Sequence, residues 1–151
     1  MTAASWELPD LEPCEELIED EDEIYFRQVN PKYFDGVEVS AQAFDTSSKD
    51  AGKLSGARSS EQTAEGAYND RIAMGGPTLG TWGVDARDVW AELSRLVDDS
   101  SCPPPDERGW PQGHCYLDQR MPDRPHRRQM RINLARVATQ KGRLHPPESE
   151  G

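Results

Sequence analysis

Residues 23–55 read EIYFRQVNPKYFDGVEVSAQAFDTSSKDAGKLS, and this stretch decides the fold that we expect. Residues 23–29 are rich in aromatic and β-branched side chains, which is typical of a strand. The Asn-Pro and Asp-Gly pairs that follow are turn signals. Residues 37–44 alternate apolar and polar side chains for most of their length, which predicts a second strand with one buried face. Residues 53–58 predict a third, shorter strand.

Two helices are expected in the middle of the chain. Residues 59–76 carry apolar side chains at helical spacing, begin at Ser59 or Ser60 as a cap, and end at a Gly-Gly-Pro sequence. Residues 85–99 begin with an aspartate suited to capping and carry one apolar stripe, which predicts an amphipathic helix. Between them, residues 78–84 predict a strand.

The last third of the chain completes the expected fold class. Residues 100–113 are rich in proline and glycine and predict an exposed loop. Residues 114–118 predict a short strand, and residues 123–142 predict a helix with proline in its first turn and glycine just past its end. The order of these elements predicts an α+β domain, with a small sheet of short strands and about three helices.

Charge is distributed unevenly along the 151 residues, whose net charge is -11. The first 23 residues hold ten acidic side chains and no basic one, which predicts disorder. Residues 120–143 hold eight basic side chains and one acidic. We therefore divide the chain into an acidic disordered segment (1–22), an α+β core domain (23–119), a basic helix (120–143) and a disordered tail (144–151).

Composition also suggests a compartment. The N-terminus lacks the basic start and apolar stretch of a secretory signal, and no apolar run is long enough to span a membrane. The three cysteines are odd in number and show no framework spacing, so reduced thiols are expected. The overall negative charge disfavours binding to anionic membranes. We expect a cytosolic protein without membrane contacts.

The oppositely charged ends of the chain are candidate contact surfaces. Their expected partner-binding residues are five arginines of the basic helix and two apolar side chains of the acidic segment: Arg124, Arg127, Arg128, Arg131, Arg136, Trp6 and Leu17. Three interpretations of the basic helix stay open. It is a solvated terminal helix, it pairs with an acidic segment of this chain or of a partner, or it contacts nucleic acid.

Few residues suggest catalysis. The weak candidates are Arg27, Ser55 and His114, which fall on or beside predicted strands. No phosphate loop, dinucleotide fingerprint or nucleophile elbow is present. The cysteines and histidines lack the paired spacing of a closed zinc site, so we expect neither a metal nor a cofactor.

The motifs YFRQVNP, VSAQAF, KDAGKLS, GTWGV and GHCYLD together resemble a family of small uncharacterised bacterial proteins. The resemblance covers residues 24–118 and implies no activity. A second resemblance is to ADP-ribosyltransferase-type folds, in which Arg27 and Ser55 would match an early basic residue and a later serine. The chain departs from that pattern because Glu61 and Glu65 fall on a predicted helix instead of a strand.

The charge layout and the lack of catalytic motifs lead to one main expectation. We expect a non-catalytic, cytosolic bacterial interaction or accessory protein, of the kind found in defence or toxin-type systems, that binds a larger protein through its charged ends. One alternative is a small nucleotide-acting enzyme of ADP-ribosyltransferase-like type. A second alternative is nucleic-acid binding through the basic helix.

Overall fold

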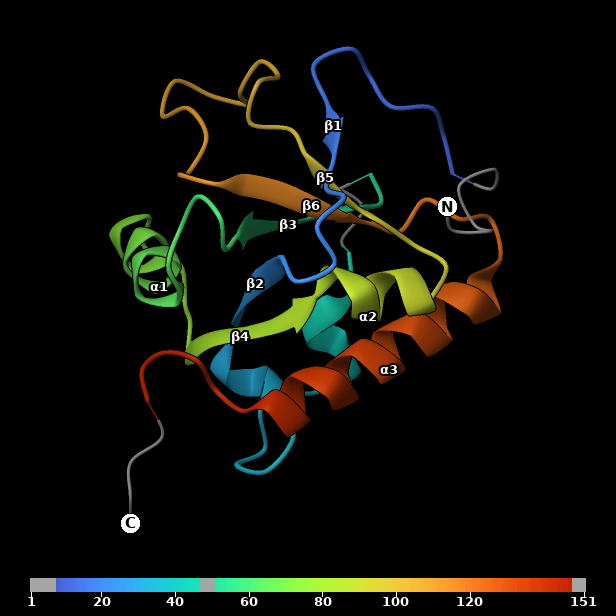
Figure 1. Ribbon diagram of the computed structural model, residues 1–151. Coiled ribbons are helices and arrows are strands. Elements are labelled where there is room, and N and C mark those ends of the chain that lie inside the picture. The colour runs from blue at the N-terminus through green and yellow to red at the C-terminus, as the bar shows by residue number, and fades with distance from the viewer. Residues whose placement is uncertain (1–7, 47–50, 148–151) are drawn as a thin grey trace.

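The computed structural model of the protein describes residues 8–46 and 51–147. These residues form one antiparallel six-stranded sheet with strand order β1-β5-β6-β3-β2-β4, together with three α-helices, which confirms the predicted α+β class (Figure 1). The strands are β1 (Glu16–Leu17), β2 (Ile24–Val29), β3 (Lys53–Arg58), β4 (Gly80–Asp85), β5 (Leu96–Asp98) and β6 (His114–Asp118). The helices are α1 (Ala64–Ala73), α2 (Ala86–Ala91) and α3 (Arg124–Lys141). Two 3-10 turns, η2 (Pro31–Tyr33) and η3 (Ala41–Phe44), lie between β2 and β3.

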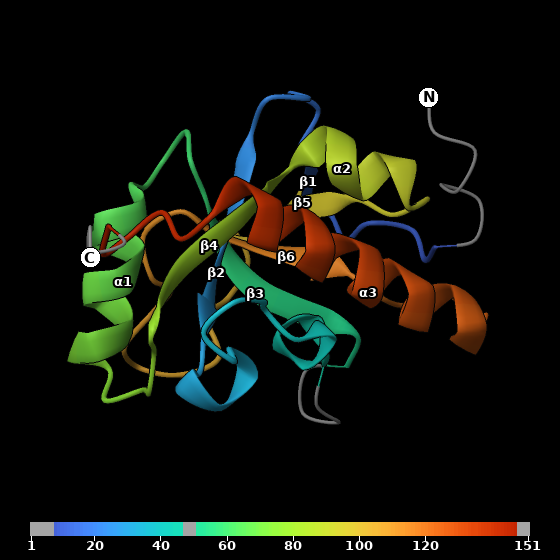
Figure 2. The same ribbon diagram turned by 90° about the horizontal axis from the view of Figure 1, so that it is seen from below.

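Helix α3 covers one face of the sheet and completes the hydrophobic core (Figure 2). It starts after Asp123 and ends at Gly142, whose φ of 83° closes the helix in a conformation that favours glycine. The predicted helix at residues 123–142 is therefore confirmed. Its buried side chains are Met130, Leu134, Ala135 and Ala138. Because these side chains belong to the core, the basic helix is packed as part of the same unit as the sheet.

Helix α1 and strand β4 also follow the predicted pattern, but the cap of α1 lies elsewhere. The side chain of Thr63 accepts a hydrogen bond from the Gly66 amide at 2.9 Å and caps the helix. Of the predicted caps, Ser59 donates its hydroxyl to the carboxylate of Glu23 at 3.1 Å, and Ser60 donates its backbone amide to the same carboxylate at 2.6 Å. The prediction of a serine cap was wrong because the Ser59 hydroxyl oxygen accepts from the Ile24 amide at 2.9 Å, and the buried Glu23 carboxylate holds both serines away from the start of the helix.

The strand predicted at residues 37–44 does not form. The side chain of Ser40 accepts from the Gln42 amide at 3.2 Å and opens the 3-10 turn η3. Ala43 and Phe44 are both buried, although an alternating strand would send them to opposite faces. Among the described residues, the sheet-like contact near this stretch is an isolated bridge between Phe34 and Val39.

The helix predicted at residues 85–99 is cut short. Helix α2 ends at Ala91, and Leu93 takes a left-handed φ of 59° that turns the chain. Residues Leu96–Asp98 then form β5, which pairs with both β6 and β1. Leu96 and Val97 are fully buried, so burial in the sheet overrides the helical periodicity of the sequence.

Much of each chain end that we expected to be disordered is held against the core. In residues 8–22, Leu8 and Ile18 are buried and β1 pairs with β5, so apolar anchors order a strongly acidic stretch. At the other end, Thr81 of β4 donates its amide to the His145 carbonyl at 2.7 Å. Residues 1–7 and 148–151, with Trp6 among them, lie outside the described residues.

The cysteines correct a further expectation. Cys14 and Cys102 form a disulfide, and Cys115 is a buried free thiol. The prediction of reduced thiols was wrong for the first two because 88 residues separate them and only the fold brings them together. Cysteine usage therefore no longer supports a cytosolic location, which stays a prediction. None of the helices in the described part of the chain has the length and apolar character that a membrane span requires.

Candidate functional site

The sheet divides between β2 and β3. The two strands pair only at Tyr25↔Arg58 and Phe26↔Ala57, whereas β2 pairs with β4 along its whole length. Beyond Phe26 the backbones separate, and the guanidinium of Arg27 spans the gap. Its Nε donates to the Ala43 carbonyl and its Nη1 to the Ser55 carbonyl, both at 2.9 Å. We call this gap, between residues 27–29 and 53–55, the sheet fork.

A glycine allows a second side chain into the fork. The ring of Tyr25 lies directly over Gly56, and a Cβ at position 56 would stand 2.6 Å from the ring atom Cζ and 2.7 Å from the Phe26 carbonyl. The Tyr25 hydroxyl reaches the carbonyls of Leu54 and Ser55 at 2.8 Å and 3.0 Å. Side-chain donors thus satisfy backbone acceptors that a continuous ladder would otherwise pair.

A cavity of about 540 Å³ opens over the sheet fork. Helix α1 and the loop of residues 100–113, which lie at the same end of the sheet, form its walls (Figures 1 and 2). Arg27 from β2, Ser55 from β3 and His114 from β6 all line it. The three weak catalytic candidates named from the sequence are therefore brought together on one pocket.

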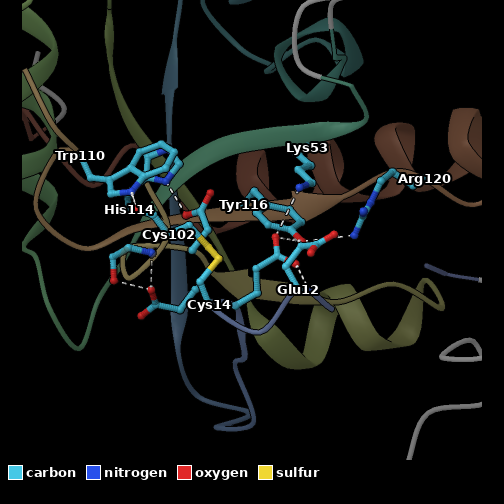
Figure 3. Close-up of a disulfide and its surroundings, with 12 residues drawn as sticks. Glu12, Cys14, Lys53, Cys102, Trp110, His114, Tyr116 and Arg120 are labelled. Atoms are coloured by element: carbon cyan, nitrogen blue, oxygen red, sulfur yellow. Dashed lines mark hydrogen bonds and ion pairs between the residues drawn. A yellow bond between two sulfur atoms is a disulfide. The ribbon is translucent and has the colours of Figure 1, made fainter. Parts of the chain in front are cut away.

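His114 is fixed in place from two sides. Its Nδ1 lies 2.6 Å from Oδ1 of the buried Asp99, and its ring stacks on Trp110 with centroids 4.3 Å apart (Figure 3). The indole Nε1 of Trp110 donates to the Cys102 carbonyl at 2.8 Å. A carboxylate accepts hydrogen bonds, so Nδ1 is the donor in this contact, which leaves Nε2 for another partner.

Ser55 and Arg71 lie at the pocket with exposed side chains. Neither the Ser55 hydroxyl nor the Arg71 guanidinium has a hydrogen bond or ion pair within residues 8–46 and 51–147, and the hydroxyl of Tyr33 likewise has no hydrogen bond there. His114 stands opposite Ala57 in the β3–β6 register, so Ser55 is its diagonal neighbour. No hydrogen bond joins His114 to Ser55 in this part of the chain, so the contact by which a base activates a nucleophile is not formed.

The other charged side chains at the pocket are already paired. Arg108 donates to Asp106 at 3.0 Å, and this hydrogen bond lowers the pKa of the Asp106 carboxyl. Asp70 accepts from Gln62 at 3.1 Å. Because these carboxylates have partners, the free guanidinium of Arg71 is the charge that the pocket offers to a ligand.

A second polar cluster lies beside the disulfide (Figure 3). The Tyr116 hydroxyl donates to Glu15 at 2.8 Å, Lys53 lies 3.4 Å from the same carboxylate oxygen, and Arg120 donates to the Tyr116 hydroxyl at 3.2 Å. Burial, and then the hydrogen bond to Glu15, raise the pKa of Tyr116 far above its usual range. The side chains of this cluster are hydrogen-bonded or ion-paired to one another, so none of them is left as a reactive group. The cluster attaches residues 8–22 to the sheet.

The five arginines predicted to bind a partner fall into two groups. Arg127 donates to the Met121 carbonyl at 2.6 Å, and Arg131 contacts Gln119 at 2.7 Å and Asp45 at 3.1 Å. The other three arginines of the prediction are exposed and have no partner among the described residues: Arg124, Arg128 and Arg136. Intramolecular contacts thus occupy two of the five side chains, and three remain available.

The acidic segment makes no ion pair with these arginines in the described part of the chain. Its carboxylates Glu15 and Asp22 pair with Lys53 and Arg87, and the neighbouring Glu23 pairs with Arg58. Leu17, a predicted contact residue, lies on the edge strand β1 with 39% of its surface exposed. Leu17 and the predicted arginines therefore lie on different elements of the described structure.

Sequence reasoning missed two residues of the pocket lining, Arg71 and Trp110, and the partner of His114, Asp99. Asp99 and Arg71 were assigned to helices and Trp110 to an exposed loop. A large aromatic residue in a proline-rich loop was the one local signal, because such a side chain needs a packing partner or a ligand. Asp99 and Arg71 carry no comparable signal, since only the tertiary arrangement brings Arg71 to the pocket and Asp99 to His114.

Comparison of the chain with protein-family models, with curated proteins and with solved structures finds no match. The family resemblance drawn from the sequence motifs therefore stays a prediction. Across the part of the chain that the structure describes, no group of three or more histidine, cysteine, aspartate or glutamate side chains is arranged to hold a metal ion. A functional assignment therefore rests on the geometry of the pocket.

Proposed function

We propose that the protein binds a small anionic molecule with a planar ring, of the nucleotide class, in the pocket at the sheet fork. One observation carries this proposal. The unpaired guanidinium of Arg71 lines the same cavity of about 540 Å³ as Arg27, Ser55 and His114. Cavities of roughly 300–1,000 Å³ suit molecules of this size.

The pocket supplies complementary chemistry for each part of such a ligand. A guanidinium recognises phosphate or carboxylate through two parallel hydrogen bonds. The Ser55 hydroxyl both donates and accepts, and Nε2 of His114 accepts from a ligand hydroxyl. Trp110 and Tyr33 add aromatic surface to the lining, which favours a planar ring.

Binding fits this geometry better than the transferase activity considered from the sequence. In that alternative Arg27 holds an anionic group, but two of its nitrogens already donate to the carbonyls of Ala43 and Ser55. Among the described residues, no base is hydrogen-bonded to Ser55. The proposed role of Arg27 is therefore to form the wall of the pocket, while Arg71 meets the anion.

Isothermal titration with ATP, AMP, NAD and inorganic phosphate tests the proposal. Arg71→Gln removes a cation that has no hydrogen bond or ion pair among the described residues, so we expect at least about a tenfold loss of affinity. Arg136→Gln is the matched control, since Arg136 is also exposed and unpaired but lies on α3. The proposal fails if no probe binds at millimolar concentration, or if Arg71→Gln binds as well as the wild-type protein.

A second function is supported by the exposed side of α3. Arg124, Arg128, Ile132 and Arg136 recur at every fourth residue, which places them along one stripe of the helix, and Ile132 is 37% exposed. Like charges four residues apart repel one another, and an acidic partner would relieve that repulsion. We propose that this stripe binds an acidic protein segment, in keeping with the interaction role expected from the charge layout.

A defined acidic probe tests the second function. Fluorescence anisotropy with a labelled polyglutamate peptide should show salt-sensitive binding that the triple change Arg124→Gln, Arg128→Gln and Arg136→Gln abolishes. Arg71→Gln is the control and should bind the peptide normally. Tighter binding of a single-stranded oligonucleotide of equal charge would contradict the proposal and assign the stripe to nucleic acid.

A further inference from the structure

We infer that the Cys14–Cys102 disulfide is a redox control on this pocket: the oxidised pair holds the loop of residues 100–113 in place, and reduction releases it. The inference concerns regulation and rests on the proposed function for its effect on ligand binding. The disulfide itself lies outside the pocket lining and acts through the residues that it positions.

A short series of contacts connects the disulfide to the pocket (Figure 3). The Cys102 carbonyl accepts from the Trp110 indole at 2.8 Å, and the Cys102 amide donates to the Asp99 carbonyl at 2.9 Å. Trp110 then stacks on His114, and Asp99 holds the Nδ1 of the same ring. Both contacts that fix His114 therefore involve a residue hydrogen-bonded to the backbone of Cys102.

The loop has few other attachments. None of residues 100–113 is buried. Gln112 donates to the Glu61 carbonyl at 2.8 Å, while the pair of Arg108 with Asp106 is internal to the loop. A segment with so little buried surface opens at low free-energy cost unless a covalent bond restrains it.

The segment on the other side of the disulfide has anchors of its own. Strand β1 pairs with β5 at Glu16↔Asp98 and Leu17↔Val97, and Leu8 and Ile18 are buried. Glu15 also accepts a hydrogen bond from Tyr116 at 2.8 Å. The disulfide thus ties the lightly attached loop to an anchored segment, and reduction removes that restraint from the loop.

The chemistry is ordinary thiol–disulfide exchange with a dithiol. A thiolate of the dithiol attacks one sulfur to form a mixed disulfide, and its second thiol then displaces the protein cysteine. Cys14 and Cys102 become thiols, and the dithiol becomes a disulfide. Both cysteines are partly exposed, so the reductant can reach them. Cys115 does not compete, because it is fully buried and burial raises the pKa of its thiol.

The test uses the full chain with and without dithiothreitol. Hydrogen exchange of the Trp110 indole N–H, followed by NMR and assigned with Trp110→Phe, reports the loop without any ligand. We expect this exchange to accelerate at least about tenfold on reduction, because the hydrogen bond to the Cys102 carbonyl is lost when the loop opens. The double variant Cys14→Ser and Cys102→Ser should show the fast rate under both conditions.

The second readout is the affinity, measured by isothermal titration, for the nucleotide probe that binds most tightly. We expect affinity to fall at least about tenfold on reduction in the wild-type protein and to stay constant in the double variant. Unchanged indole exchange on reduction overturns the inference, whatever the ligand does. Absence of binding in both redox states counts against the proposed function alone, because the indole exchange still decides whether the disulfide controls the loop.

Discussion

The two faces of the sheet show how one set of strands serves two purposes. Strand alternation sends Leu54 and Leu117 into the core beneath α3, where they are at most 2% exposed, and sends Ser55 and His114 to the opposite face. Four side chains of α3 are buried, whereas none of α1 is. The face covered by α3 stabilises the fold through buried apolar side chains. The opposite face, on the side of α1, leaves polar side chains at the pocket.

The largest effect should come from the face under α3. Leu134→Ala removes a fully buried side chain from the centre of α3 and should lower the free energy of unfolding by about 2–5 kcal/mol. Ile132→Ala, two residues away and 37% exposed, should change it by less than about 0.5 kcal/mol. Urea denaturation of both variants checks the comparison, and equal losses would mean that α3 does not pack as described.

The second largest effect on stability should come from a substitution at the sheet fork. Gly56→Ala places a methyl group against the Tyr25 ring and should cost about 1–3 kcal/mol. The cost should shrink but not vanish when Tyr25 is also changed to alanine, because the methyl group then no longer meets the ring but still meets the Phe26 carbonyl. A double-mutant cycle measured by denaturant unfolding gives the coupling, and additive losses would contradict the close approach of the ring to Gly56.

Glu23 lies next to the end of the fork where β2 and β3 pair, and it should make the stability of the protein depend on pH. Glu23 is 3% exposed and accepts hydrogen bonds from Arg58 at 2.6 Å and 3.0 Å. Burial raises the pKa of Glu23, but hydrogen bonds from Arg58 and Ser60 outweigh it and bring the pKa below its ordinary value of 4.5. A lowered carboxyl pKa adds stability above the ordinary value, and that stability is lost as pH falls through the folded-state pKa.

Unfolding free energies measured between pH 7 and pH 3 check this expectation. The wild-type protein should lose stability as the pH falls below about 4.5, the ordinary glutamate value. Glu23→Gln should be less stable at pH 7 and should show a flatter pH dependence in the acid range. Parallel curves for the two proteins would show that Glu23 does not titrate with folding.

The smallest effect belongs to the exposed stripe of α3. Arg128→Gln removes the repulsion between Arg124 and Arg128 and should raise stability by about 0.2–0.5 kcal/mol at low salt. The gain should vanish in 0.5 M salt, where charges on the surface are screened. Thermal unfolding at two salt concentrations measures it. A loss of stability instead would reveal an intramolecular contact of Arg128.

Local patterns predicted the elements whose stability is decided locally. The strand at residues 53–58 and the helix at residues 123–142 were found because apolar spacing and end signals lie within each segment. The turn at Ala41–Phe44 and the strand at Leu96–Asp98 were missed because burial of neighbouring side chains decides them. That burial is set by parts of the chain far away in the sequence.

The candidate site shows the same limit. Arg27, Ser55 and His114 could be named in advance because each is a polar side chain on or beside a recognisable strand. Their convergence depends on the separation of β2 from β3, which no local pattern encodes. The role of Asp99 and the disulfide could not be predicted from local sequence either, because each depends on a contact between segments that are distant in the chain.

The position of Arg27 links the architecture of the domain to its evolution. One planar side chain cross-links carbonyl groups from two separate segments and also forms part of the cavity wall. Lysine would keep the positive charge but could not reproduce two hydrogen bonds in fixed directions. Natural variation or redesign at this position therefore changes the shape of the sheet and the wall of the cavity in a single step.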